Sequence, residues 1–264
     1  MLVDVVCIVA FLHTGTSGEE EAKMIRSIVQ EIDRSPSLYR RFELPTDVVA
    51  APKSVLAKLM AVAVDERESF DKERVRRNAG KEKYDAAHSV RAAVFAAVEA
   101  SQETQRRTLR LELSAVPITP KLKAAIAKDQ ADIAAAIFHL EQVLDEMIDA
   151  EKGIDKEPRK HWQAQYHWAR SQLQADMIFL MEYNFALGAI RADRLPELDK
   201  GDVGWKIMFV LRPRAPEAKV KSLAKDRAKR LSLLEKNYAD TPWAHFAARE
   251  GERWIGMEWM TRKK

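Results

Sequence analysis

One stretch decides the fold class of this chain: Tyr238-Ala239-Asp240-Thr241-Pro242-Trp243-Ala244-His245-Phe246-Ala247. Thr241 offers the hydroxyl preferred at a helix N-cap, and Pro242 suits the first helical position because no backbone N–H is needed there. Upstream, apolar residues recur at steps of three and four, so they share one helical face: Val220, Leu223, Ala224, Ala228, Leu231, Leu234 and Tyr238. The pattern predicts a helical hairpin over residues 215–259.

This hairpin carries a family resemblance. The pattern Tyr-x-Asp-Thr-Pro-x-Ala-x-x-Ala at 238–247 resembles a tetratricopeptide-type unit, and the tail over 241–259 is similar to the C-terminal region of a group of uncharacterised bacterial proteins. Some of those proteins have a von Willebrand A-type domain upstream. The similarity covers residues 161–259 and implies a helical packing or protein-interaction module, with no catalytic residue. No tandem 34-residue period accompanies it, so we expect one hairpin closing a bundle.

Composition favours a helical protein with a sizeable core. The chain has 264 residues, of which 47% are hydrophobic and 32% are charged, and it contains only nine glycines and ten prolines. The single cysteine, Cys7, excludes an intrachain disulfide and a cysteine-based zinc site.

Apolar periodicity predicts three further long helices, and a Pro- and Gly-containing loop over 191–216. The helices are expected at 84–112, 120–151 and 159–190, and the last is apolar on most sides, as buried central helices are. Shorter helices are expected at 19–33 and from Ser54 to Asn78. We therefore predict an all-α irregular helical bundle, with an N-terminal segment over 1–52 and a helical domain over 53–264.

The apolar run at residues 2–12 has three open interpretations. It is too short to span a bilayer, which needs roughly 20 residues, so no transmembrane span is expected. Its β-branched residues suit one short buried strand, but it also resembles a signal remnant or the cut edge of another domain. The chain reads as cytoplasmic, whereas a signal remnant or a truncated N-terminus would indicate an extracytoplasmic location.

Candidate chemistry is sparse. Asp85 and His88 lie one helical turn apart, but a helical di-metal site needs two such units and two further carboxylates. Asp176 and Glu182 lie in the most apolar helix, where burial can raise a carboxyl pKa for acid catalysis, although pairing with Arg170 or Arg191 is the simpler interpretation. We predict no catalytic, cofactor or metal residue, and no bound cofactor.

The C-terminal end supplies the functional leads. Residues 203–264 contain 15 Lys and Arg against 7 Asp and Glu, a net charge of +8 in a chain whose total is +4. The candidate interaction surface consists of these residues: Trp243, Trp254, Trp259, Lys221, Lys225, Lys229 and Arg230. The tryptophans would form an exposed patch or fasten the end of the hairpin.

Three functional hypotheses follow. The first is a non-enzymatic helical scaffold or interaction module with an unknown protein partner. The second is a helical enzyme or metal protein that uses Asp85, His88, Asp176 or Glu182. The third is binding of an anionic surface by the basic end. Nucleic acid is not expected, because the basic residues lack interleaved aromatics and a recognition motif.

Overall fold

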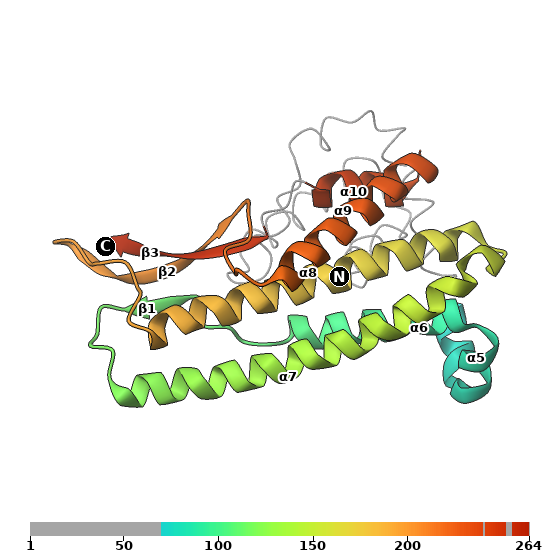
Figure 1. Ribbon diagram of the computed structural model, residues 1–264. Helices are drawn as coiled ribbons and strands as arrows, with labels where there is room; N and C mark the ends of the chain where they lie inside the picture. The colour runs from blue at the N-terminus through green and yellow to red at the C-terminus, as the bar shows by residue number, and fades with distance from the viewer. Residues whose placement is uncertain (1–69, 240, 252–254, 264) are drawn as a thin grey trace, which may run out of the picture.

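The computed structural model describes residues 70–239, 241–251 and 255–263, which form a largely helical protein with a small three-stranded sheet (Figure 1). The expectations for the run at 2–12, the helix at 19–33 and the boundary between residues 52 and 53 lie outside these residues. Within them, residues 70–78 are helical.

Two long helices form the body of the molecule. These are α7 (Pro120–Ala150) and α8 (Lys160–Arg191), joined by the short 3-10 helix η3 (Glu151–Lys156), and they lie side by side along the structure in Figure 1. Thr119 caps α7, because its side-chain oxygen accepts from the N–H of Leu122 at 3.2 Å. The helices predicted at 120–151 and 159–190 are confirmed.

Helix α8 is the central element. It packs against α6 (Ser89–Gln105) and α7 and also against the C-terminal helix α9 (Ala218–Asn237). Every residue from 164 to 178 is buried. Burial on all sides requires the polar groups of this helix to find partners inside the protein.

The helix predicted over 84–112 is wrong in its extent. The segment forms two helices, α5 (Lys81–Ala87) and α6 (Ser89–Gln105), and then leaves the helical conformation. His88 separates them with a non-helical backbone, at φ −136° and ψ 56°. Apolar periodicity continues across this residue, so the sequence pattern does not reveal the break.

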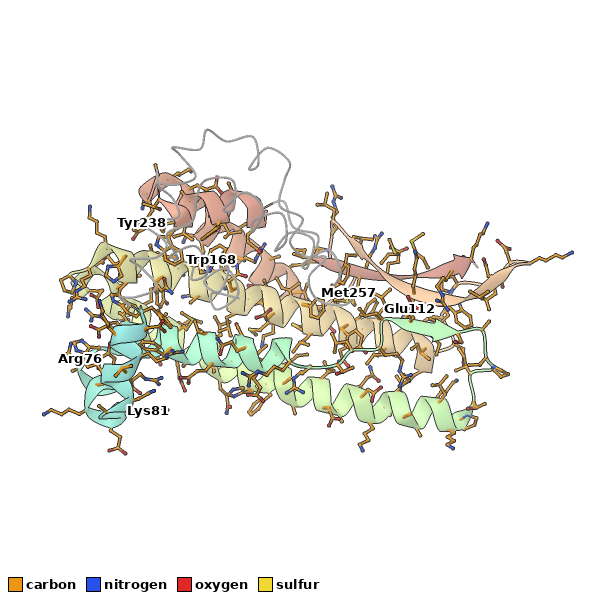
Figure 2. The ribbon with its side chains drawn as sticks, turned by 180° about the vertical axis from the view of Figure 1, so that it is seen from behind. Arg76, Lys81, Glu112, Trp168, Tyr238 and Met257 are labelled. Atoms are coloured by element: carbon orange, nitrogen blue, oxygen red, sulfur yellow. The ribbon has the colours of Figure 1, made fainter. Side chains whose placement is uncertain are left out.

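The C-terminal hairpin is present, but its second helix is shorter than predicted. Helix α9 is followed by α10 (Pro242–Gly251), and the two pack against each other. Trp168 lies on α8 beside this hairpin (Figure 2), and its side chain belongs to a buried cluster with Leu231 of α9 and Trp243 of α10. The chain beyond Ile255 is extended, so Trp259 does not belong to the hairpin.

The prediction of a mainly helical protein is confirmed, but the chain also builds a small antiparallel sheet that an all-α fold does not include. Its strands are β1 (Glu112–Ser114), β2 (Asp202–Val210) and β3 (Gly256–Lys263), in the order β1-β2-β3. Strand β2 lies in the segment predicted as a loop. Its partners are about 90 residues upstream and 50 residues downstream, so the pairing that stabilises it is invisible in a local pattern.

The sheet packs on the C-terminal half of α8. The Trp259 Nε1–H donates to the carbonyl of Ala186 at 2.8 Å, and the rings of Phe179 and Phe209 stack with centroids 6.1 Å apart. A Cβ on Gly204 would lie 2.1 Å from the Leu113 carbonyl oxygen, so the close approach of β1 at this position requires a glycine.

Candidate interaction surface on helix α9

Helix α9 is fixed to α8 by a buried face that contains apolar and charged side chains. Val220, Leu223, Leu231 and Leu234 are buried, as their spacing predicts. Arg227 and Arg230 are buried as well. The lysine-rich sequence of α9 therefore divides into two sets of basic residues with different surroundings.

Arg230 does not belong to the exposed basic face on which the sequence placed it. Its guanidinium forms ion pairs with both carboxylate oxygens of Glu151, and Nη2 lies 3.0 Å from Glu151 Oε2. Its Nε lies 3.6 Å from Asp226. The charge of Arg230 is thus neutralised inside the protein, which argues against a role in an interaction surface.

A second arginine joins the same network from α8. Arg170 donates to Glu151 at 2.7 Å and to Asp226 at 2.9 Å, and Gln174 donates to the same Asp226 oxygen at 2.7 Å. Burial raises the pKa values of Glu151 and Asp226, but hydrogen bonds and the arginine charges outweigh it and leave both pKa values lowered. Two arginines facing two carboxylates form a balanced network between η3, α8 and α9.

His167 lies beside this network and remains neutral. Its Nδ1 is 3.3 Å from Arg230 Nη1. Burial, followed by the positive charge of Arg230, lowers the pKa of His167 to about 4. The neutral ring therefore accepts from Arg230 at physiological pH, which is a structural role.

Arg227 joins the two helices of the hairpin. Its Nη2 donates to the side chain of Glu250 at 2.5 Å and to the backbone carbonyl of the same residue at 2.9 Å. Both side chains are buried. This pair fixes α10 against α9 and removes a second arginine from the surface.

The remaining basic residues of α9 form an exposed row. Lys221, Lys225 and Lys229 are exposed and four residues apart, so successive side chains lie about 6 Å apart along the helix. None of them forms an ion pair with another described residue, whereas the neighbouring Lys219 contacts Glu141 at 2.7 Å. This row, which we call the lysine row, has a charge of +3 that no acidic side chain of the described residues neutralises through an ion pair.

The tryptophans are placed differently from the lysines. Trp243 is 5% exposed and contacts the rings of Trp168 and Phe246, with centroids 6.3 Å and 6.5 Å away. Trp259 is also 5% exposed. Burial of both argues against an exposed patch. Trp243 fastens the hairpin, as one interpretation held, whereas Trp259 lies in β3 and fastens the sheet to α8. Trp254 lies outside the described residues.

Asp85 and His88, the carboxylate and histidine of the second hypothesis, both contact other side chains of the protein. Asp85 accepts from Arg77 at 2.7 Å and 3.2 Å, and the His88 ring lies against Tyr84 with centroids 4.7 Å apart. In the described part of the chain, no group of three His, Cys, Asp or Glu residues is arranged to hold a metal ion.

Glu182 has a role that the sequence did not suggest. It is fully buried, and its carboxylate accepts the backbone N–H groups of Arg214, Ala215 and Met257 at 2.8–3.0 Å. The pairing predicted with Arg170 or Arg191 is wrong, since Arg170 binds Glu151 and Asp226, and Arg191 donates to Gln130 at 2.7 Å. Glu182 instead holds the start of β3 beside the loop that precedes α9. Asp176 is buried on the same helix.

None of the helices described here combines the length and apolar character required to cross a membrane. Comparisons with models of protein families, with curated proteins and with solved structures find no match for the chain.

Proposed function

We propose that this protein is a non-enzymatic helical scaffold that binds an acidic protein partner through the lysine row of α9. The observation that carries the proposal is the separation of charge on this helix. Its two arginines are buried in ion pairs, while Lys221, Lys225 and Lys229 face solvent without a described acidic partner.

The packing of α9 against α8 and α10 holds the lysine row in place, which favours recognition of a partner. Leu231 and Leu234 pack against α8 and α10, and the Arg170–Glu151–Arg230 contacts fix α9 at Arg230. A fixed row of like charges steers an oppositely charged surface and sets its register, with an effect on association rate that falls as salt rises. The resemblance of the hairpin to tetratricopeptide-type units points to the same class of function.

The test compares two variants with equal changes in net charge. The first is Lys221→Glu/Lys225→Glu/Lys229→Glu, and the control places the same substitutions at three exposed lysines elsewhere: Lys128, Lys160 and Lys200. Partners captured by the wild-type chain in its own cells are identified, purified and measured by interferometry at two salt concentrations. We expect the lysine-row variant to lose about tenfold or more in association rate, and the control variant to lose little.

Equal loss in both variants would show that only net charge matters and would contradict the proposal. Binding to anionic vesicles, abolished by the lysine-row substitutions and without a protein partner, would favour the anionic-surface hypothesis instead.

A further inference from the structure

Strand β3 forms one edge of the sheet, and the direction of its backbone groups follows from two hydrogen bonds. The N–H of Ile207 in β2 donates to Leu111 at 2.8 Å, on the β1 side, and Ile207 lies opposite Trp259. The N–H of Met257 donates to Glu182, which is outside the sheet. Because backbone groups alternate in direction along an antiparallel strand, Met257, Trp259 and Thr261 direct theirs away from β2.

Contacts from residues 70–239, 241–251 and 255–263 cover the first part of this edge. Glu182 occupies the outward N–H of Met257, and Arg214 binds Glu258 through two contacts of 2.6 Å and 2.8 Å. Among the described residues, no backbone group bonds to the outward groups of Trp259 or Thr261. The next side chain, Met260, is 49% exposed, so within the part of the chain that the structure describes this edge has no backbone partner and is partly apolar.

We infer that a second copy of this chain docks on this edge, with the two β3 strands antiparallel and centred on Met260. In this register, Trp259 of each copy lies opposite Thr261 of the other copy. Both residues direct their backbone N–H and C=O groups away from β2 and toward the second copy. The register therefore forms four hydrogen bonds across the two-fold axis. A register shifted by one residue would pair outward groups with inward ones, so the parity of the strand restricts the alignment.

Charge complementarity selects this occupant and this register. Centring the pair on Met260 places Glu258 of each copy opposite Arg262 of the other, and it brings the two Met260 side chains together. Within one chain, Glu258 contacts Arg214 and Arg262 contacts Glu112, but these ion pairs are largely exposed. Exposed ion pairs contribute little and exchange partners readily. The same surface patch meets itself, as a two-fold interface requires.

The first experiment measures self-association of the full chain by sedimentation velocity. Because the pairing is short, we expect a dimer with a dissociation constant on the order of 10–100 µM. Thr261→Pro removes an outward N–H without removing a bond to β2, so it should weaken the dimer about tenfold or more while circular dichroism is unchanged. Thr261→Val keeps the N–H and should dimerise like the wild type. A chain that stays monomeric up to about 1 mM would overturn the inference.

Charge reversal tests the register independently of the proline variant. Glu258→Arg and Arg262→Glu should each weaken the dimer, because each places like charges opposite one another. The combined variant Glu258→Arg/Arg262→Glu restores opposite charges and should recover dimerisation. Recovery supports the alignment on Met260, whereas a double variant as weak as the singles overturns it.

Cross-linking gives a direct readout of the alignment. In a Cys7→Ser background, Met260→Cys should form a disulfide-linked dimer under mild oxidation, since non-hydrogen-bonded partners have Cα atoms about 4.5 Å apart. Glu258→Cys should not, because residue 258 lies opposite residue 262. Equal cross-linking of both variants would overturn the register. The lysine-row variant should dimerise normally, so failure of the dimer and failure of the proposed function are separable.

Discussion

Arg227 and Glu250 form a buried ion pair that joins helices α9 and α10, with 2.5 Å between Nη2 and Oε2. Removing one partner leaves the other charged and buried, so we expect Glu250→Ala to lower the free energy of unfolding by about 3–5 kcal/mol. Urea unfolding followed by circular dichroism measures it. The double variant Arg227→Met/Glu250→Leu removes both charges and should cost much less than Glu250→Ala. If the single variant is as stable as the wild type, the pair does not hold the hairpin.

Glu182 should be the most costly carboxylate to remove from α8. Glu182→Ala leaves three backbone N–H groups without their acceptor, and we expect a loss of about 2–4 kcal/mol in the free energy of unfolding. Hydrogen exchange should accelerate at Ala215 and Met257, which donate to this carboxylate. The exposed Glu217→Ala is the control. Unchanged exchange at those amides would mean that other groups hold the two segments together.

His167 should make stability depend on pH in a defined window. Its pKa is about 4 in the folded protein, against about 6.5 in the unfolded chain, so the unfolded chain binds more protons between these values. Stability is therefore full above pH 6.5 and falls, by about 2–3 kcal/mol, as pH decreases toward 4.

The control for this prediction is His167→Gln, which keeps an acceptor for Arg230 but does not titrate. Its stability should fall less than that of the wild type between pH 7 and pH 5, and His161, whose pKa burial also lowers, contributes to the part that remains. Glu151 and Asp226 do not contribute to a loss of stability between pH 7 and pH 5. Their pKa values are lowered in the folded protein, so the stability that they provide is lost only as pH falls below the ordinary pKa of a carboxyl group. Parallel pH profiles for the variant and the wild type would exclude His167 as the origin.

Two glycines in and beside β2 provide a matched comparison. Gly204 has φ 149° and Gly201 has φ 99°, so alanine at either position is strained by about 1–2 kcal/mol. Only at Gly204 would the new Cβ collide with backbone, at 2.1 Å from the Leu113 oxygen, whereas Gly201 has open space. Gly204→Ala should therefore cost more than Gly201→Ala in thermal unfolding, and it should loosen β1. Equal costs would mean that β1 adjusts freely.

Local patterns were sufficient for the long helices of this chain. Helices α7 and α8 follow apolar stripes with clear ends, Thr119–Pro120 before one and Pro158 before the other, so their limits were predicted within one or two residues. Strand β2 was missed because its partners lie at 112–114 and 256–263, and because Gly201, Gly204 and nearby prolines indicate a loop.

The candidate surface was predicted only in part, for a related reason. Lys229 and Arg230 are neighbours in a basic sequence, yet one is exposed and the other is buried against Glu151. The sequence placed both on one basic face, because a local pattern does not show that η3 brings a carboxylate to the arginine. Acids on separate elements decide which basic residues remain available for a partner.

The order of the sheet also constrains how the molecule folds. The strands β1 and β3 both pair with β2 and not with each other, and the Arg262–Glu112 side-chain pair connects β3 and β1 across 150 positions of sequence. Closing such a span has a large entropic cost, whereas α7 and α8 are adjacent in the chain and can pair early. Substitutions between α7 and α8 should therefore slow folding, while substitutions in β3 should mainly speed unfolding. We therefore expect the sheet to form late in folding, after α7 and α8 have paired.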